Sequence, residues 1–216
     1  MDRRKKVIII AALAGLLSFL LVFFLSGRRH HRGYQLTEAD TIAITPAPQF
    51  CADSAMAYVK AQCDFGPRTP NSQAHDQCAD WIIAKFTAIG ASVEEQRTTL
   101  RGYDSTAYSC RNIIARVNPE QADRVVIGAH YDSRLWADND PDPANHHKPV
   151  MAANDGASGV AVMLEMARAI GTMPLSIGVD FVCFDLEDQG RPKWAEPADE
   201  DDERGGNYWC LGSQYW

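Results

Sequence analysis

Three clusters of polar side chains in the second half of the chain contain residue types that bind transition metals. In chain order they are His130 with Asp132, then Asp155, then Glu187 with Asp188. Imidazole nitrogen and carboxylate oxygen are donors that suit Zn²⁺, which takes few ligands. These residue types predict a metal site, most simply a zinc site, if the fold brings the clusters together.

The elements in front of the clusters explain how they could meet. Val125–Ala129 is a short continuous apolar run, as in a strand that is covered on both faces, and Ile177–Phe184 is expected to be another buried strand. A helical pattern, Ala157–Ile170, begins just after Asp155. In open α/β sheets, ligands bind beyond the carboxyl ends of the strands. We therefore expect all the clusters to face one crevice.

Each cluster by itself has a plainer interpretation. Asp155 could simply cap the helix that follows it, and Glu187 with Asp188 could form a solvated turn. The metal-site hypothesis depends on the clusters occurring together, each at the end of an element. A competing calcium site is excluded, because Asp138–Asp142 begins like an EF-hand loop but Pro143 stands where that loop needs glycine.

The remaining patterns predict an α/β sandwich built on a mixed sheet. Val93–Leu100 and Tyr108–Val117 alternate as strands do, and we expect an antiparallel pair at a sheet edge. A short helix is expected from Asp53, as its N-cap, to about Cys63. An amphipathic helix is expected from about Ser72 to Ile89.

Composition limits the class of protein. The chain has 216 residues and a formal net charge of -7, which argues against a nucleic-acid partner because phosphate binding needs clustered Lys and Arg. Its six cysteines form no C-x-x-C pair, which argues against a structural zinc ribbon or finger. Cys183 lies within an apolar strand pattern and is interpreted as a small buried hydrophobe.

The N-terminus has the pattern of an export signal. Basic residues at positions 3–6 precede the uncharged apolar run Val7–Leu25. This run is close to the ~20 residues that span a bilayer. No A-x-A-like cleavage site follows, which favours an uncleaved signal anchor over a removed signal peptide. We expect an anchor at residues 1–27, a polar linker at 28–49 and one domain at 50–216.

The polar clusters also carry a resemblance to a known family. The segments His130–Ser133 (HYDS), Asn154–Gly159 (NDGASG) and Phe184–Asp188 (FDLED) resemble the metal-site motifs of the zinc aminopeptidase superfamily. Within it, loops make the chain more similar to bacterial glutaminyl cyclases (glutaminyl-peptide cyclotransferases) than to true aminopeptidases. These loops are Phe65–Arg68, Ala137–His147 and Cys210–Trp216.

Carried over residue by residue, the resemblance implies Asp155 and Asp188 as zinc ligands and Glu187 as the acid/base that shuttles a proton. His130 and Asp132 would support the site, although His130 would be a ligand in relatives with two metals. One Zn²⁺ is expected for a cyclase and two for an aminopeptidase. The family domain continues beyond this chain's end, where a histidine ligand and a further acidic residue are expected.

The resemblance implies a zinc-dependent cyclotransferase that converts the N-terminal glutamine of peptides to pyroglutamate and releases ammonia. A zinc aminopeptidase, in which Glu187 would activate water, is the first alternative. A catalytically silent, membrane-tethered binding module is the second. Trp136, Trp194 and Trp209 could line a neutral substrate pocket, but ordinary loop packing explains them as well.

The resemblance also implies a fold and a location. The fold would be a three-layer αβα sandwich with a mixed, mostly parallel central sheet, as in zinc exopeptidases, and the N-terminal pattern described above adds a transmembrane helix before it. The domain would lie in the periplasm of a bacterium, anchored to the inner membrane, or would be secreted after signal cleavage. Its partners would be peptides or proteins with a free N-terminus, and the membrane through its N-terminal helix.

Overall fold

The computed structural model describes residues 47–171, 173–196 and 206–216. The expected signal anchor and nearly all of the expected linker lie outside these residues. Within the described ranges, no helix is both long enough and apolar enough to cross a membrane. The anchor therefore stays a prediction from sequence.

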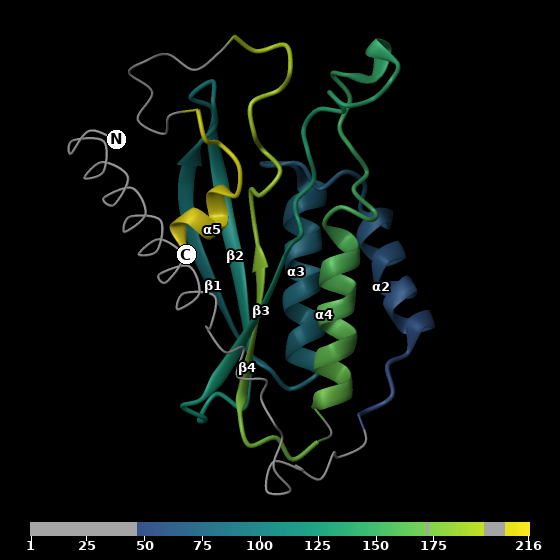
Figure 1. Cartoon of the computed structure of the whole chain (residues 1–216), viewed down its shortest axis with the longest axis vertical. Helices are drawn as coiled ribbons and strands as arrows, with labels where there is room; N and C mark the ends of the chain where they lie inside the picture. The colour runs from purple at the N-terminus through teal and green to yellow at the C-terminus, as the bar shows by residue number, and fades with distance from the viewer. Residues whose placement is uncertain (1–46, 172, 197–205) are drawn as a thin grey trace, which may run out of the picture. The chain divides into compact units, whose positions relative to one another are not determined.

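A four-stranded mixed sheet, in the order β1-β2-β4-β3, forms the centre of the domain (Figure 1). Its strands are β1 (Ser92–Arg101), β2 (Ala107–Val117), β3 (Arg124–His130) and β4 (Gly178–Phe184). The β1–β2 and β2–β4 pairings are antiparallel, and the β3–β4 pairing is parallel. The mixed sheet and the antiparallel pair at one edge are thus confirmed. A mostly parallel sheet is wrong for the described strands, because antiparallel pairings outnumber the parallel one.

Helices α3 and α4 lie against one face of the sheet, and α2 packs on α4 (Figure 1). The helices of the described residues are α2 (Ala52–Asp64), α3 (Gln73–Ala88), η2 (Pro143–Asn145), α4 (Ala157–Ile170) and α5 (Leu211–Tyr215). Helix α3 confirms the amphipathic helix expected from about Ser72 to Ile89, and the Ser72 hydroxyl caps it by accepting a hydrogen bond from the His75 N–H. The expected cap of α2 is wrong, because Cys51 rather than Asp53 is the N-cap.

Strand β2 shows that helices lie on both faces of the sheet. Adjacent side chains of a strand point to opposite faces. Arg111 reaches the Asp76 carboxylate of α3 at 3.2 Å, whereas its neighbour Asn112 donates to the Gly212 carbonyl of α5 at 2.8 Å. Among the described residues, the second face carries this one short helix.

The core fills the space between the sheet and α3 with α4. Phe86 of α3 and Phe181 of β4 stack there with their ring centroids 5.7 Å apart, and Cys183 is fully buried as expected. Strand β3 differs from expectation, since Val125 and Val126 are 46% and 49% exposed. The expectation that β3 is covered on both faces is therefore wrong here. The reason is that β3 is an edge strand of the described sheet.

Candidate metal centre

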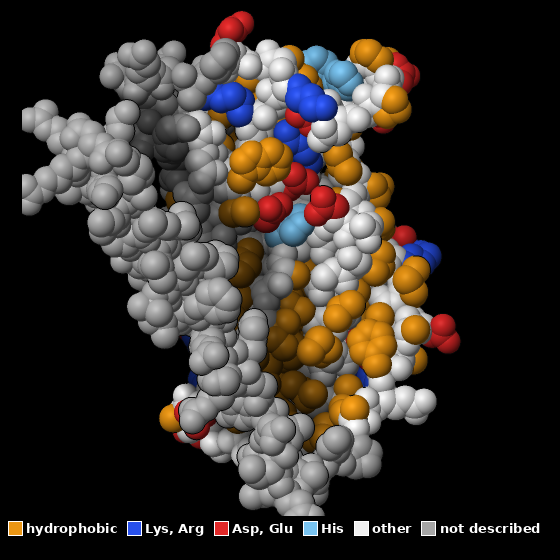
Figure 2. Space-filling view, in the orientation of Figure 1, with side chains coloured by type: hydrophobic (Ala, Val, Ile, Leu, Met, Phe, Trp, Pro, Cys, Tyr) orange, Lys and Arg blue, Asp and Glu red, His pale blue; other side chains and the backbone are white. Residues whose placement is uncertain are grey.

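The parallel pairing of β3 and β4 brings the polar clusters together. His130 at the end of β3 is in register with Phe184 at the end of β4, so the following residues leave the sheet at the same edge. The turn before α4 adds Asp155. The His130 Nε2 atom lies 2.9 Å from Asp155 Oδ1 and 3.8 Å from Glu187 Oε2. Figure 2 shows Asp and Glu side chains gathered around a histidine on this face, beside hydrophobic side chains.

Asp132 links the end of β3 to the loop after β4. Its carboxylate is fully buried and accepts hydrogen bonds from the backbone N–H groups of Glu187 (3.1 Å) and Asp188 (3.3 Å). It also accepts from Gln189 Nε2 at 2.9 Å and contacts His130 Nδ1 at 3.3 Å. Burial raises the pKa of Asp132, but these donors outweigh it and hold the pKa below its usual range.

The charge balance of the site favours a bound cation. Burial lowers the pKa of His130, but the carboxylates of Asp132, Asp155 and Glu187 outweigh burial and raise it to about 9. Burial, opposed by Arg134 and reinforced by the neighbouring carboxylates, raises the pKa of Asp188 to about 7. A divalent ion would supply the positive charge that this group of oxygen donors lacks. Their donor chemistry therefore fits Zn²⁺.

Asp155 does not cap α4. The N-cap of α4 is Gly156, which makes no side-chain cap bond, and the Asp155 side chain is 75% exposed beside His130. Gly156 has a φ of 103°, and a Cβ atom there would lie 3.0 Å from both Asp132 O and His130 Cε1. Glycine therefore allows the turn that carries Asp155 to approach the end of β3.

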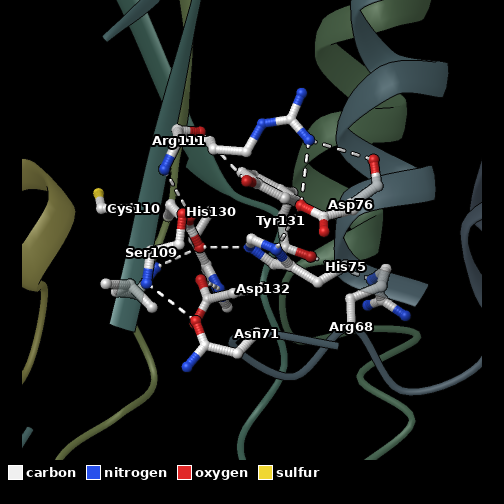
Figure 3. Close-up of polar contacts among 12 residues, drawn as sticks. Arg68, Asn71, His75, Asp76, Ser109, Cys110, Arg111, His130, Tyr131 and Asp132 are labelled. Atoms are coloured by element: carbon white, nitrogen blue, oxygen red, sulfur yellow. Dashed lines mark hydrogen bonds and ion pairs between the residues drawn. The ribbon is translucent and has the colours of Figure 1, made fainter. Parts of the chain in front are cut away.

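A buried ion pair behind the site supports the loop after β4. His75 of α3 places Nε2 at 2.8 Å from Asp185 Oδ1, and Asp185 Oδ2 accepts from the Arg111 N–H at 2.7 Å. The His75 ring stacks on Tyr131, with centroids 5.1 Å apart (Figure 3). Neither His75 nor Asp185 is among the site residues expected from the sequence, although Asp185 lies within the FDLED segment. The signal it passed over is a carboxylate directly at the end of a buried strand.

Glu187 is held by its neighbours in the chain and by Cys210. Leu186, just before it, has a φ of 52°, a left-handed conformation that is uncommon for leucine. The Cys210 N–H donates to Glu187 O at 2.8 Å, and the Cys210 thiol donates to Glu187 Oε1 at 3.2 Å. These contacts orient the Glu187 carboxylate towards His130.

A cavity of about 690 Å³ adjoins the candidate ligands. It is lined by Glu187, Asp188 and Trp209, among others. A second cavity of about 320 Å³ is lined by Trp136, Trp209 and Asp188, among others. Trp194 lines neither of these two and packs on Trp136, with centroids 6.2 Å apart. Of the expected pocket residues, Trp209 thus lines both cavities, Trp136 lines one and Trp194 lines neither.

Across the described part of the chain, no three His, Cys, Asp or Glu side chains are placed to hold a metal ion together. Asp155 and Asp188 can each supply an oxygen donor. The histidine ligand that the family resemblance leads us to expect has no counterpart among these residues. The described residues thus provide part of a metal centre.

Comparisons with known proteins agree with this geometry. Residues 112–216 match the family model for Peptidase family M28. The glutaminyl cyclase of Bacteroides thetaiotaomicron, crystallised with N-acetylhistamine, is 47% identical, with a TM-score of 0.73 over 79% of this chain and 56% of that chain. A Zn-dependent exopeptidase from Parabacteroides distasonis is 45% identical, with a TM-score of 0.74 over 79% of this chain and 56% of that one.

The curated relatives include Aminopeptidase YwaD of Bacillus subtilis, which is 29% identical over 57% of this chain and 25% of the relative. The chain thus spans a quarter of that curated relative and 56% of the two solved chains above. The resemblance to bacterial glutaminyl cyclases and zinc exopeptidases is confirmed. The matches show similarity to zinc-dependent enzymes of the M28 superfamily.

Proposed function

We propose that the protein is a zinc-dependent glutaminyl-peptide cyclotransferase, which converts the N-terminal glutamine of peptides to pyroglutamate and releases ammonia. One observation carries the proposal: Asp155, Glu187 and Asp188 converge on a cavity that Trp209 lines. The 47% identity to a glutaminyl cyclase supports it. We further propose that residues 1–27 anchor the domain to the inner membrane of a bacterium, with the domain in the periplasm.

The chain's own residues would act on the substrate as follows. Asp155 and Asp188 would bind one zinc ion, together with the histidine ligand that the family resemblance implies. Zinc would supply a Lewis acid for the side-chain amide carbonyl of the substrate. Glu187 would accept a proton from the α-amine as its nitrogen bonds to the amide carbon. The carbon–nitrogen bond of the side-chain amide then breaks, and Glu187 would give the proton to the leaving ammonia.

The contacts of Glu187 suit this task. The buried Asp132 carboxylate accepts hydrogen bonds from the backbone N–H groups of Glu187 and Asp188. One carboxylate therefore positions both the proposed acid/base and the proposed zinc ligand. The Cys210 thiol donates to Glu187 Oε1, and the other carboxylate oxygen of Glu187, Oε2, faces His130. A positioned carboxylate beside a cavity suits proton transfer to and from a bound substrate.

A zinc aminopeptidase is the second candidate, favoured by the position of His130. Its Nε2 atom lies 2.9 Å from Asp155 Oδ1, close enough for both groups to bind a second ion. Glu187 would then take a proton from attacking water, and the free amine of the substrate would face the second ion. A tethered binding module without activity is the remaining candidate.

The test is to incubate the full-length natural protein with zinc and a peptide that begins with glutamine. We expect ammonia release with loss of the free N-terminus. Glu187→Gln should lower this rate by about a hundredfold or more while leaving zinc stoichiometry unchanged. Release of a free N-terminal residue instead would assign the protein to the aminopeptidases. A folded, zinc-loaded protein without either reaction would support the binding module.

A further inference from the structure

We propose that Arg134 is a positioning residue that holds both the metal ligand Asp188 and the pocket wall Trp209. The inference rests on the proposed function, since it takes Asp188 as a zinc ligand. Arg134 lies four residues beyond His130 in the chain and is only 5% exposed. Its guanidinium joins the loop after β3 to the loop after β4 and to Trp209.

The first link is to the loop that carries Asp188. Arg134 Nη1 donates to the Asp188 carbonyl at 2.9 Å and to the Gly190 carbonyl at 3.2 Å. The same nitrogen lies 3.7 Å from Asp188 Oδ1. One terminal nitrogen therefore contacts both the backbone and the carboxylate of the proposed ligand. This restricts how Asp188 can turn towards a metal ion.

The second link fixes Arg134 itself. Its Nε and Nη2 atoms donate to the two carboxylate oxygens of Asp138 at 2.7 and 2.8 Å. Asp138 is 3% exposed and also accepts from the Lys193 N–H at 3.1 Å. Only the planar fork of arginine can make this paired contact and still present a third nitrogen to the other loop.

The third link is to the aromatic wall of the cavity. The Arg134 Cζ atom lies 4.7 Å from the ring centroid of Trp209 and 5.5 Å from that of Trp136. Trp209 also packs on Gly190, where a Cβ atom would lie 1.9 Å from its Cε2 atom. The guanidinium and the Gly190 backbone therefore both set the position of the Trp209 ring.

Because Arg134 contacts both Asp188 and Trp209, its loss should have an effect that the loss of a merely structural residue would not have. Losing the guanidinium should weaken zinc binding and loosen Trp209 together, because one group holds both. Removing a partner that orients a metal ligand typically weakens metal binding by about 10- to 100-fold. A structural arginine elsewhere should affect stability alone.

Arg124 is the matched control. It donates to the Asp180 carboxylate at 3.1 Å and to the carbonyls of Asn118 (2.7 Å) and Gln121 (3.1 Å). It also donates to the Val117 carbonyl at 3.3 Å, and thus, like Arg134, combines one carboxylate with backbone carbonyl acceptors. It stands at the start of β3, about 20 Å from the strand's other end. Its loss should cost stability without touching the metal site.

The experiment compares Arg134→Met, Arg134→Lys and Arg124→Met in the full-length natural protein. The zinc dissociation constant is measured by competition with a chromogenic chelator, together with Tm of the metal-free form and tryptophan fluorescence. We expect Arg134→Met to raise the dissociation constant about tenfold or more and to shift the fluorescence. Arg134→Lys should restore only part of the affinity, and Arg124→Met should lower Tm with unchanged affinity.

Equal zinc affinity in wild type and both Arg134 variants would overturn the inference and leave the proposed function intact. An affinity loss of the same size in Arg124→Met would also overturn it, since the effect would then follow general stability. Failure of the wild-type protein to bind zinc would overturn both the inference and the proposed function. If Arg134→Met does not fold, Arg134→Lys and Asp138→Asn carry the comparison, with a smaller expected loss.

Discussion

Asp132 is the residue on which the geometry of the candidate site depends most. No solvent reaches its carboxylate, and the hydrogen bonds that it accepts come from two backbone N–H groups and the Gln189 side chain. Each donor would lose its partner if the carboxylate were removed. Leaving a buried donor without a partner lowers the free energy of unfolding, whereas an exposed donor can form a hydrogen bond with water instead.

Asp132→Asn should therefore lower the stability of the metal-free protein by about 1–3 kcal/mol. An asparagine places an NH₂ group against N–H donors at one of its two positions, so at least one donor stays unpaired. Chemical denaturation followed by circular dichroism measures the change. The exposed Glu120→Gln variant serves as control, with an expected effect below about 0.5 kcal/mol. A stability equal to wild type in Asp132→Asn would contradict this role.

At the scale of elements, the contact between α3 and the end of β4 should make the stability of the folded protein depend on pH. Burial lowers the pKa of His75, but the hydrogen bond and the charge of Asp185 outweigh burial, so the pKa lies above the usual 6.5. A raised pKa in the folded state means that the charged imidazolium stabilises the fold. This stability is fully present below the unfolded pKa and is lost as pH rises through the folded pKa.

The stability difference between wild type and His75→Gln should therefore be largest below the unfolded pKa of about 6.5 and should shrink as pH rises through the raised folded pKa. Glutamine keeps a hydrogen-bond donor near Asp185 but carries no charge. Denaturation curves at several pH values measure the unfolding free energy of each protein. Subtracting the value for the variant from that for wild type cancels the contributions of the other titrating groups. A difference that does not change with pH would show that His75 stays neutral throughout.

The second prediction at the scale of elements concerns the turn directly before α4. Gly156→Ala should weaken zinc binding and lower stability by about 1–2 kcal/mol, because it adds both a left-handed alanine and a Cβ clash with the His130 region. Gly90→Ala is the matched control, since Gly90 has a φ of 92° with no atom within 4 Å of its Cβ position. Equal losses of zinc affinity in both variants would mean that the close approach at Gly156 is unimportant.

At the scale of the whole molecule, binding of the proposed metal ion by the loops should raise the stability of the folded domain. A ligand that binds only the folded state stabilises it by about 2.7 kcal/mol at a concentration of 100 times its dissociation constant. We expect Tm of the full-length protein to fall on chelation and to recover with zinc. Asp155→Ala should reduce the difference between the two conditions. Recovery with magnesium as effective as with zinc would argue against a zinc site.

The local sequence by itself determined most elements and the position of the candidate site along the chain. The helix expected at Ala157–Ile170 has these bounds in the structure, and the strands differ by at most one residue at each end. Hydrophobic period, helix caps and turn residues act between neighbours in the chain, so they can be read without a fold. The donor types at the strand ends are likewise visible in the sequence.

Only the tertiary structure decided which partners these residues have. It showed that Asp155 faces His130 and does not cap its helix, and that Val125 and Val126 lie on an edge strand. It also showed contacts between residues that lie far apart in the chain: Asp185 meets His75 across 110 positions, and Arg134 meets Asp188 across 54. Such contacts depend on strand order and loop path, which side-chain spacing along the chain does not contain.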